Sequence, residues 1–187
     1  MRRSLVFRGL LLTGSVLAAG AASGGEALAC NPSVVVSGPG SSGNISNSGT
    51  VDCVVVKDGA IVNGDVTNEA GGAVGTATSQ EAGIAVHDAT INGAIVNRGV
   101  ISTTTGPAIS VTGKSAVTGG IQNDGSATVT GGDAGGNAQG ISVSGAQMTG
   151  GITNTGTIIV TTGKGRAVGI GVGQPPTVSS PPQEPQQ

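Results

Sequence analysis

The residues that could do acid–base chemistry are few and lie far apart in the chain. They are Lys57, Asp58, Asp65, His87, Asp88 and Lys114. Enzymes that cleave polysaccharides use clustered carboxylic acids, or a Lys or Arg base, held in a groove, and usually bind sugar rings with aromatic side chains. Asp58 and Asp88 are expected at one corner of the fold, with His87 beside them. A charged corner facing solvent explains these three residues without catalysis, so we predict no catalytic residues.

Two other motifs fall short of a binding site. Gly113-Lys114-Ser115 is similar to the end of a phosphate-binding loop, but Ala108 stands where that loop requires a glycine. Cys30, Cys53 and the distant His87 provide too few ligands for the four positions of a structural zinc site. We therefore expect neither a cofactor nor a metal.

The composition argues against a nucleic-acid partner. The chain has 187 residues, of which 36 are glycines and one, Phe7, is aromatic. From Cys30 onward it has no aromatic residue, and nine acidic against five basic residues give a formal net charge of −4. Binding to nucleic acid favours a basic face and stacking aromatics. Without large side chains, the core must be thin and consist of Val, Ile and Ala.

Residues 1–29 have the organisation of an export signal. Basic residues at the start precede a short apolar stretch over residues 9–22, and residues 27–29 form a small-x-small cleavage site. The mature chain is then exported, and is secreted, periplasmic or at the cell surface. Lipidation of Cys30 is an alternative, although Leu28 stands one place later than in the usual lipoprotein signal.

The two cysteines, Cys30 and Cys53, both lie in the exported part. An oxidising compartment favours their pairing as one disulfide. Such a bridge would close a loop of about 24 residues and stabilise the fold by roughly 3 kcal/mol in the chain-entropy model. We predict no free thiol in the exported protein, and alkylation of the unreduced, denatured protein would test this.

An internal repeat is the strongest feature of the sequence. The pattern Gly-x-[Ile/Val]-x-Asn occurs five times, and four copies continue as Asn-x-Gly, with Ala70 in place of the last glycine in the second copy. Its central apolar residues are Ile45, Val66, Ile95, Ile121 and Ile152. Its asparagines are Asn47, Asn68, Asn97, Asn123 and Asn154. Five copies with fixed internal spacing indicate five stacked units.

Each unit contains short runs with strand periodicity. An [Ile/Val]-x-Val step, such as Ile84-x-Val86, precedes the motif in the last four copies, and a further apolar run follows it in three copies, at Val51, Ile101 and Ile158. Alternation of apolar and small polar residues over such short runs favours strands, and glycine allows sharp corners between them. Three short strands per unit predict an all-β fold, a parallel β-helix of about five coils over residues 43–172.

The repeat also assigns structural positions. The central apolar residues form an inward core column, and the five asparagines form a ladder of side-chain amides at one corner. The residue after each asparagine varies, and stacking would place Arg98 between Glu69 and Asp124 as a surface ion-pair ladder. Residues 30–42 are expected to form an irregular N-terminal cap, and residues 173–187, rich in Pro and Gln, a disordered tail or linker.

Four variable loops follow the third strand of their units, so we expect them on one side of the rod. They cover residues 76–82, 103–107, 130–139 and 161–167. Loops on one face of a rigid scaffold are where recognition is usually found. A specific partner, if there is one, is therefore predicted to bind here.

The repeat units resemble the passenger repeats of bacterial autotransporter adhesins. The best matches are Gly140-Ile141-Ser142-Val143 and residues 148–158, and the similarity covers about residues 43–172. The resemblance implies a right-handed parallel β-helix, exported across the inner membrane and displayed on a Gram-negative cell surface. The Pro/Gln-rich segment stands where the family continues into a translocator barrel, so association with the outer membrane would need a separate partner barrel.

These observations favour a secreted or surface-displayed adhesin-like protein without catalytic activity, whose unknown surface ligand is a glycan or a protein. A small exported β-helix polysaccharide lyase or hydrolase is the alternative. A truncated passenger remnant of a split autotransporter, with no function of its own, is the second. Residues 140–172 are also expected to present a bare edge, open to self-association end to end.

Overall fold

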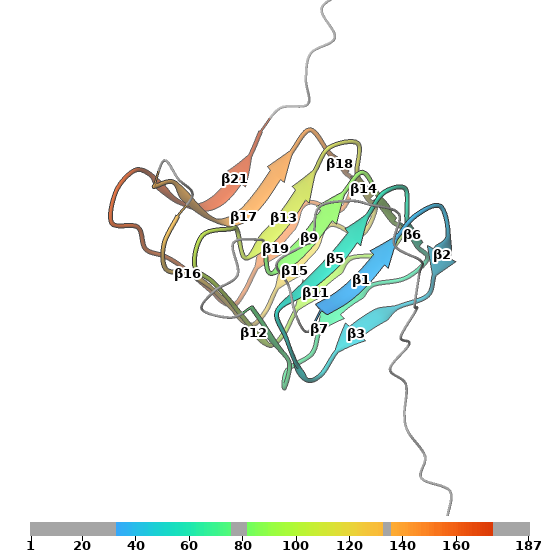
Figure 1. The fold of residues 1–187 in the computed structure, drawn as a ribbon, viewed down its shortest axis with the longest axis horizontal. Coiled ribbons are helices and arrows are strands. Elements are labelled where there is room, and N and C mark those ends of the chain that lie inside the picture. The colour runs from blue at the N-terminus through green and yellow to red at the C-terminus, as the bar shows by residue number, and fades with distance from the viewer. Residues whose placement is uncertain (1–32, 76–81, 133–135, 174–187) are drawn as a thin grey trace, which may run out of the picture.

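Four parallel β-sheets form the walls of the molecule. The computed structural model describes residues 33–75, 82–132 and 136–173, and these residues form 21 strands. The chain runs through sheets A, B, C and D in turn and then returns to sheet A (Figure 1). No helix in the described part of the chain is long and apolar enough to cross a membrane. The predicted signal peptide, Cys30 and the Pro/Gln-rich tail beyond Gly173 lie outside the described residues.

Every strand pairs in parallel with the strand one coil away. Sheet A consists of β1 (Ser33–Ser37), β5 (Cys53–Lys57), β9 (Ile84–His87), β13 (Ile109–Thr112), β17 (Ala138–Ser144) and β21 (Ala167–Val172). Sheet B consists of β2 (Ser41–Ser42), β6 (Ile61–Val62), β10 (Thr90–Ile91), β14 (Ala116–Val117) and β18 (Gln147–Met148). Sheet C consists of β3 (Ile45–Asn47), β7 (Val66–Asn68), β11 (Ile95–Asn97), β15 (Ile121–Asn123) and β19 (Ile152–Asn154). Sheet D consists of β4 (Thr50–Val51), β8 (Ala73–Val74), β12 (Val100–Thr103), β16 (Ser126–Val129) and β20 (Thr157–Val160).

This arrangement confirms the predicted all-β parallel solenoid and corrects its cross-section. Three sheets contain five strands each, so about four turns of chain separate their first and last strands. Each coil has four strands instead of three. The additional strand is the two-residue strand of sheet B, which contributes the buried residues Val62, Ile91 and Val117 to the core.

The solenoid also begins earlier than the repeat pattern predicted. Residues 33–42, expected to form an irregular cap, instead contain strands β1 and β2. Strand β1 pairs along its whole length with β5, from Ser33 opposite Cys53 to Ser37 opposite Lys57. The first coil is therefore a regular member of the stack.

The core is a narrow stack of aliphatic side chains from all four walls. In sheet C, Ile95 pairs with Val66 on one side and Ile121 on the other, and it is fully buried. In sheet D, Ile101 lies between Val74 and Ala127 in the same way. β-branched residues suit this pleated interior, because they pack closely against their cross-strand neighbours. No aromatic side chain is needed to fill the space.

Cys53 lies outside this core. With Val55 it forms a second buried cluster, against which Val35 and Ala85 pack. Cys53 is fully buried and Val55 is 3% exposed. Because Cys30 lies outside the described residues, the disulfide between Cys30 and Cys53 stays a prediction.

A column of glycines allows the coils to approach closely between sheets C and D. In the second coil the sequence has Ala70 where the other repeats have this glycine. The register of Thr50 with Ala73 shows that Gly72 takes the place instead, after two additional residues at the corner. The complete column is Gly49, Gly72, Gly99, Gly125 and Gly156.

Candidate functional site

The residues that could do acid–base chemistry lie mostly at the corner between sheets A and B. Lys57 and His87 pair in register, so the residues that follow them, Asp58 and Asp88, lie on adjacent coils. Both aspartates have a positive φ, at 58° and 48°. The equivalent residues after strands β1, β13 and β17 are Gly38, Gly113 and Gly145, all with positive φ. Asp tolerates this left-handed conformation better than most residues do, so both aspartates fit the requirements of the turn.

The side chains of Lys57, Asp58, His87 and Asp88 contact one another in pairs at this corner. Lys57 Nζ lies 3.3 Å from Asp58 Oδ2, and His87 Nε2 lies 3.3 Å from Asp88 Oδ2. The other oxygen of Asp88, Oδ1, accepts a hydrogen bond of 2.7 Å from the backbone N–H of Lys114. These exposed contacts stabilise the turn, and each aspartate carboxylate here has a cationic or backbone partner.

Asp65 lies at a different corner, between sheets B and C. Its Oδ1 accepts a 2.8 Å hydrogen bond from the backbone N–H of Ala94 in the next coil. The structure therefore does not bring Asp65 together with Asp58 and Asp88. Within the described ranges, no three His, Cys, Asp or Glu side chains are placed to hold a metal ion.

The five motif asparagines form a continuous chain of side-chain hydrogen bonds. Each Nδ2 donates to the Oδ1 of the asparagine in the following coil, at 2.9, 2.8, 2.7 and 2.7 Å from Asn47 to Asn154. Each of the first four also donates to a backbone carbonyl of the following coil. Asn68, Asn97 and Asn123 are fully buried. Because it is buried, this part of the ladder connects coils and is not a surface for a ligand.

Replacing Asn97 with alanine should lower stability by about 2 kcal/mol, because Asn68 Nδ2 would lose an acceptor and Asn123 Oδ1 would lose its donor inside the fold. The matched control is Asn154→Ala at the exposed end of the ladder, which should change stability by less than about 1 kcal/mol. Urea unfolding of both variants measures the difference. Equal losses of stability in the two variants would contradict the interpretation that the buried part of the ladder holds the coils together.

The predicted ion-pair ladder beside the asparagines is only half present. Arg98 pairs with Glu69, with 3.5 Å between Nη1 and Oε2. Within the described residues there is no ion pair between Arg98 and Asp124. Asp124 instead accepts hydrogen bonds from Gln122 Nε2 at 2.7 Å and from Thr155 Oγ1 at 2.6 Å. Nearer hydroxyl and amide donors have replaced the expected cation.

The described parts of the variable loops connect sheet D to the next strand of sheet A, so they lie along one edge of the solenoid, which we call the D–A edge. It comprises the described residues 104–108, 130–132, 136–137 and 161–166. Residues 76–81 of the first predicted loop lie outside the described residues. Two of these loops are joined: the backbone N–H of Arg166 donates to Asn137 Oδ1 at 3.2 Å, and that of Ala138 donates to the carbonyl of Arg166 at 2.8 Å. Within the first loop, Thr103 Oγ1 donates to the carbonyl of Gly106 at 2.7 Å.

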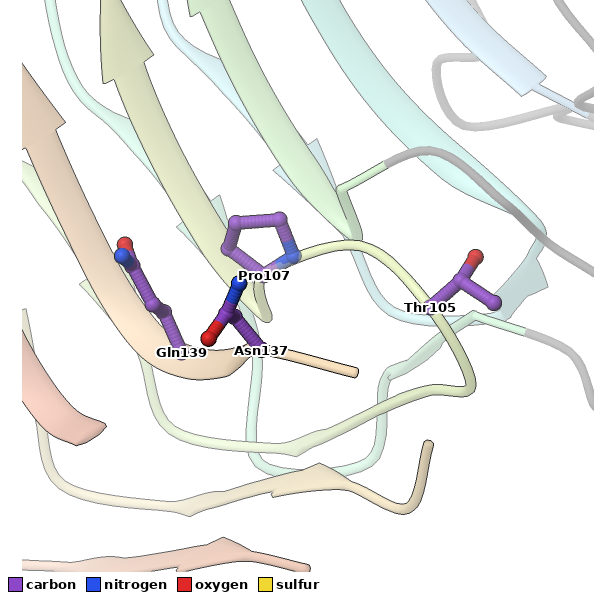
Figure 2. A pocket seen from close by; sticks show the side chains of 4 residues that line it. All are labelled: Thr105, Pro107, Asn137 and Gln139. Atoms are coloured by element: carbon purple, nitrogen blue, oxygen red, sulfur yellow. The ribbon is translucent and has the colours of Figure 1, made fainter. Parts of the chain in front are cut away.

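Two open depressions lie on the D–A edge. Figure 2 shows the first, with Asn137 beside Pro107, and with Gln139 and Thr105 on either side of them. The second shares Asn137 and Gln139 and continues to Arg166 and Val168. Their volumes are about 210 and 310 Å³, at or below the lower limit of ordinary small-molecule pockets. They suit contact with part of a larger ligand better than enclosure of a small one.

Sequence reasoning placed these loops on one side but did not single out Asn137, Gln139 or Arg166. Asn137 ends one loop and Gln139 lies in the strand β17 that follows it, whereas Arg166 belongs to the next loop along the stack. The two loops differ in length, and no spacing in the sequence indicates that Arg166 meets Asn137. Comparison of the chain with protein-family models, with curated proteins and with solved structures finds no match.

Proposed function

We propose that this chain is an exported, adhesin-like binding protein without catalytic activity, and that the D–A edge is its binding surface. The observation that carries this proposal is the pair of adjoining depressions, built from consecutive loops on a stacked scaffold. The residue types match the role: amide groups both donate and accept hydrogen bonds, and Arg166 adds a cation. The predicted export signal and the resemblance to autotransporter passengers support surface display.

The geometry favours a ligand that contacts several coils at once. The lining side chains repeat along the stack at intervals of one coil, about 4.8 Å. A glycan chain or an extended protein segment presents hydroxyl or amide groups at many points, and each shallow contact is weak alone. Affinity would then come from the number of contacts made along the rigid edge.

Binding of the exported protein to arrays of bacterial and host surface glycans and proteins tests the proposal. Any ligand found should lose at least tenfold in affinity with Asn137→Ala or Arg166→Ala. The matched control is Asn92→Ala, an exposed asparagine at the opposite corner that donates to Asn63 Oδ1 at 2.9 Å. Equal weakening by the control would move the site away from the D–A edge. Release of products from acidic polysaccharides would contradict the absence of catalysis.

A further inference from the structure

The second depression is formed by two pairs of residues at the point where sheet A meets the D–A edge. Strand β17 pairs in parallel with β21, with Gln139 opposite Val168. Asn137 and Arg166 stand two residues before this pair, and the 3.2 Å hydrogen bond from the Arg166 backbone N–H to Asn137 Oδ1 joins them. Ala138 is only 1% exposed, so the residues on either side of it lie on the outer face of the sheet. A guanidinium group and two amides therefore share one shallow surface.

The charge around this depression is positive, although the chain from Cys30 onward has a formal net charge of −4. Residues 136–173 contain Lys164 and Arg166 and no acidic residue, a formal charge of +2. Both basic side chains are exposed, and neither makes an ion pair with another described residue. The acidic residues of the variable loops, Glu81 and Asp133, lie outside the described residues. The described part of the edge thus presents two cations to solvent.

Lys164 lies beside the same depression. Residues 161–166 pack against the loop of the preceding coil, where Thr162 Oγ1 contacts the carbonyl oxygens of both Gly136 and Lys164. A side chain at Gly136 would collide with the backbone carbonyl of Lys164. Gly136 directly precedes Asn137, which lines both depressions. The two cations are therefore held two residues apart on one short loop, next to the amides.

A ligand that offers hydroxyl groups alone would gain little affinity here. From Cys30 onward the chain has no aromatic side chain on which a sugar ring could stack. A hydrogen bond between an amide and a hydroxyl replaces bonds that both groups already make with water, so its net contribution is small. Hydrogen bonds from a guanidinium or ammonium group to an anionic oxygen are roughly twice as strong as those between neutral groups. Arginine can also bind a carboxylate through two parallel hydrogen bonds.

We propose that the ligand of the D–A edge is an acidic glycan. Its carboxylate or sulfate groups bind Arg166 and Lys164, and its hydroxyl groups bind the amides of Asn137 and Gln139, which lie next to each other in Figure 2. This inference rests on the proposed function and names the class of ligand. Both cations are exposed, so we expect the interaction to weaken as salt is added.

The lining of the depressions favours a glycan over an acidic protein segment. Protein partners usually anchor themselves through large apolar or aromatic side chains that fill desolvated pockets. The two depressions are open, and their apolar lining is limited to Pro107 and Val168. Amides and cations instead match the hydroxyl and acidic groups that an acidic glycan repeats along its length.

Matched polysaccharides test the class of ligand. The exported protein should bind polygalacturonate, which carries carboxylates, or dextran sulfate. Binding to methyl-esterified polygalacturonate and to neutral dextran should be at least about tenfold weaker. Affinity for the charged polymer should fall at least about fivefold in about 1 M salt, where the screening length is about 3 Å. Binding to neither charged polymer would overturn the proposal. Equal binding to polyglutamate would overturn the choice of a glycan over an acidic protein segment.

Neutral variants locate the contact. Arg166→Gln retains the backbone hydrogen bonds of this residue and should weaken binding to the acidic polysaccharide about tenfold. Lys164→Gln should weaken it about threefold, the effect of roughly one exposed ion pair. The matched control is Lys114→Gln, an exposed lysine between β13 and β14. It makes the same change in net charge and should leave the affinity unchanged. Equal weakening by Lys114→Gln and Arg166→Gln would show attraction to overall charge and overturn the proposal.

The outcome also separates the class of ligand from the location of the binding surface. Suppose that a neutral glycan binds with an affinity that neither salt nor Arg166→Gln changes, and that Asn137→Ala weakens this binding. The acidic class would then be wrong, whereas the D–A edge would remain the binding surface. If Asn92→Ala weakens binding as much as Asn137→Ala does, the proposed binding surface itself is wrong.

Discussion

Replacing Ile95 with aspartate should unfold the protein at temperatures where the parent chain remains folded. Ile95 is fully buried in the core, between Val66 and Ile121 of the neighbouring coils. A carboxylate at this position has neither water nor a cation as a partner, so the expected loss of stability is at least about 4 kcal/mol. This is a large part of the roughly 5–15 kcal/mol by which native domains are stable. Thermal unfolding followed by circular dichroism measures the loss.

The matched control is the same change on the outward face of sheet C. Thr153 lies in β19, is exposed, and points away from the core. Thr153→Asp should alter stability by no more than about 0.5 kcal/mol. Similar losses in the two variants would show that the inward and outward faces of sheet C are assigned wrongly.

The inward columns could be predicted because the repeat determines both the strand and its register. Each motif has its apolar residue and its asparagine two positions apart, so aligning one pair aligns the other. The structure pairs Ile95 with Ile121 and Asn97 with Asn123 accordingly. A one-residue slip would move the apolar residues to the outer face, so the alternation in the sequence excludes it.

The first coil has the same strand pattern in its sequence as the later coils, although residues 30–42 were expected to form an irregular cap. Val34-x-Val36 is an [Ile/Val]-x-Val step that ends seven residues before Gly43, and the other steps end seven or eight residues before their motif glycines. It forms strand β1, with Val34 opposite Val54 and Val36 opposite Val56. Extending the repeat pattern to the first motif would therefore have identified the additional strand of sheet A.

Other features could not be predicted because they depend on the lengths of corners. The second coil has two additional residues before Gly72, so counting from Asn68 misplaces the glycine. The D–A edge has the same difficulty, since Asn137 and Arg166 belong to different loops and meet only when the coils stack. The repeat specifies the walls of the solenoid, whereas the insertions between repeats determine its candidate site.

Replacing Gly99 with alanine should cost about 3 kcal/mol or more, because the coils approach too closely at this corner for a side chain. A methyl group there would collide with the carbonyl oxygens of Gly72 and Glu69 and would lie 2.8 Å from Asn68 Nδ2. The neighbouring coil would have to move away, which would lengthen the 2.9 Å hydrogen bond from the backbone N–H of Val100 to the carbonyl of Gly72.

The same substitution at Gly49, in the first coil, should have the opposite sign. Gly49 occupies the same column, but a methyl group there meets no atom within 4 Å, since no described coil precedes it. Alanine restricts the unfolded chain more than glycine does, so Gly49→Ala should stabilise the protein by about 0.4–1 kcal/mol. Chemical unfolding of the two variants measures both changes. Opposite signs at equivalent positions would show that the glycine is required by the stacking of coils, whereas equal losses would show that the corner itself requires it.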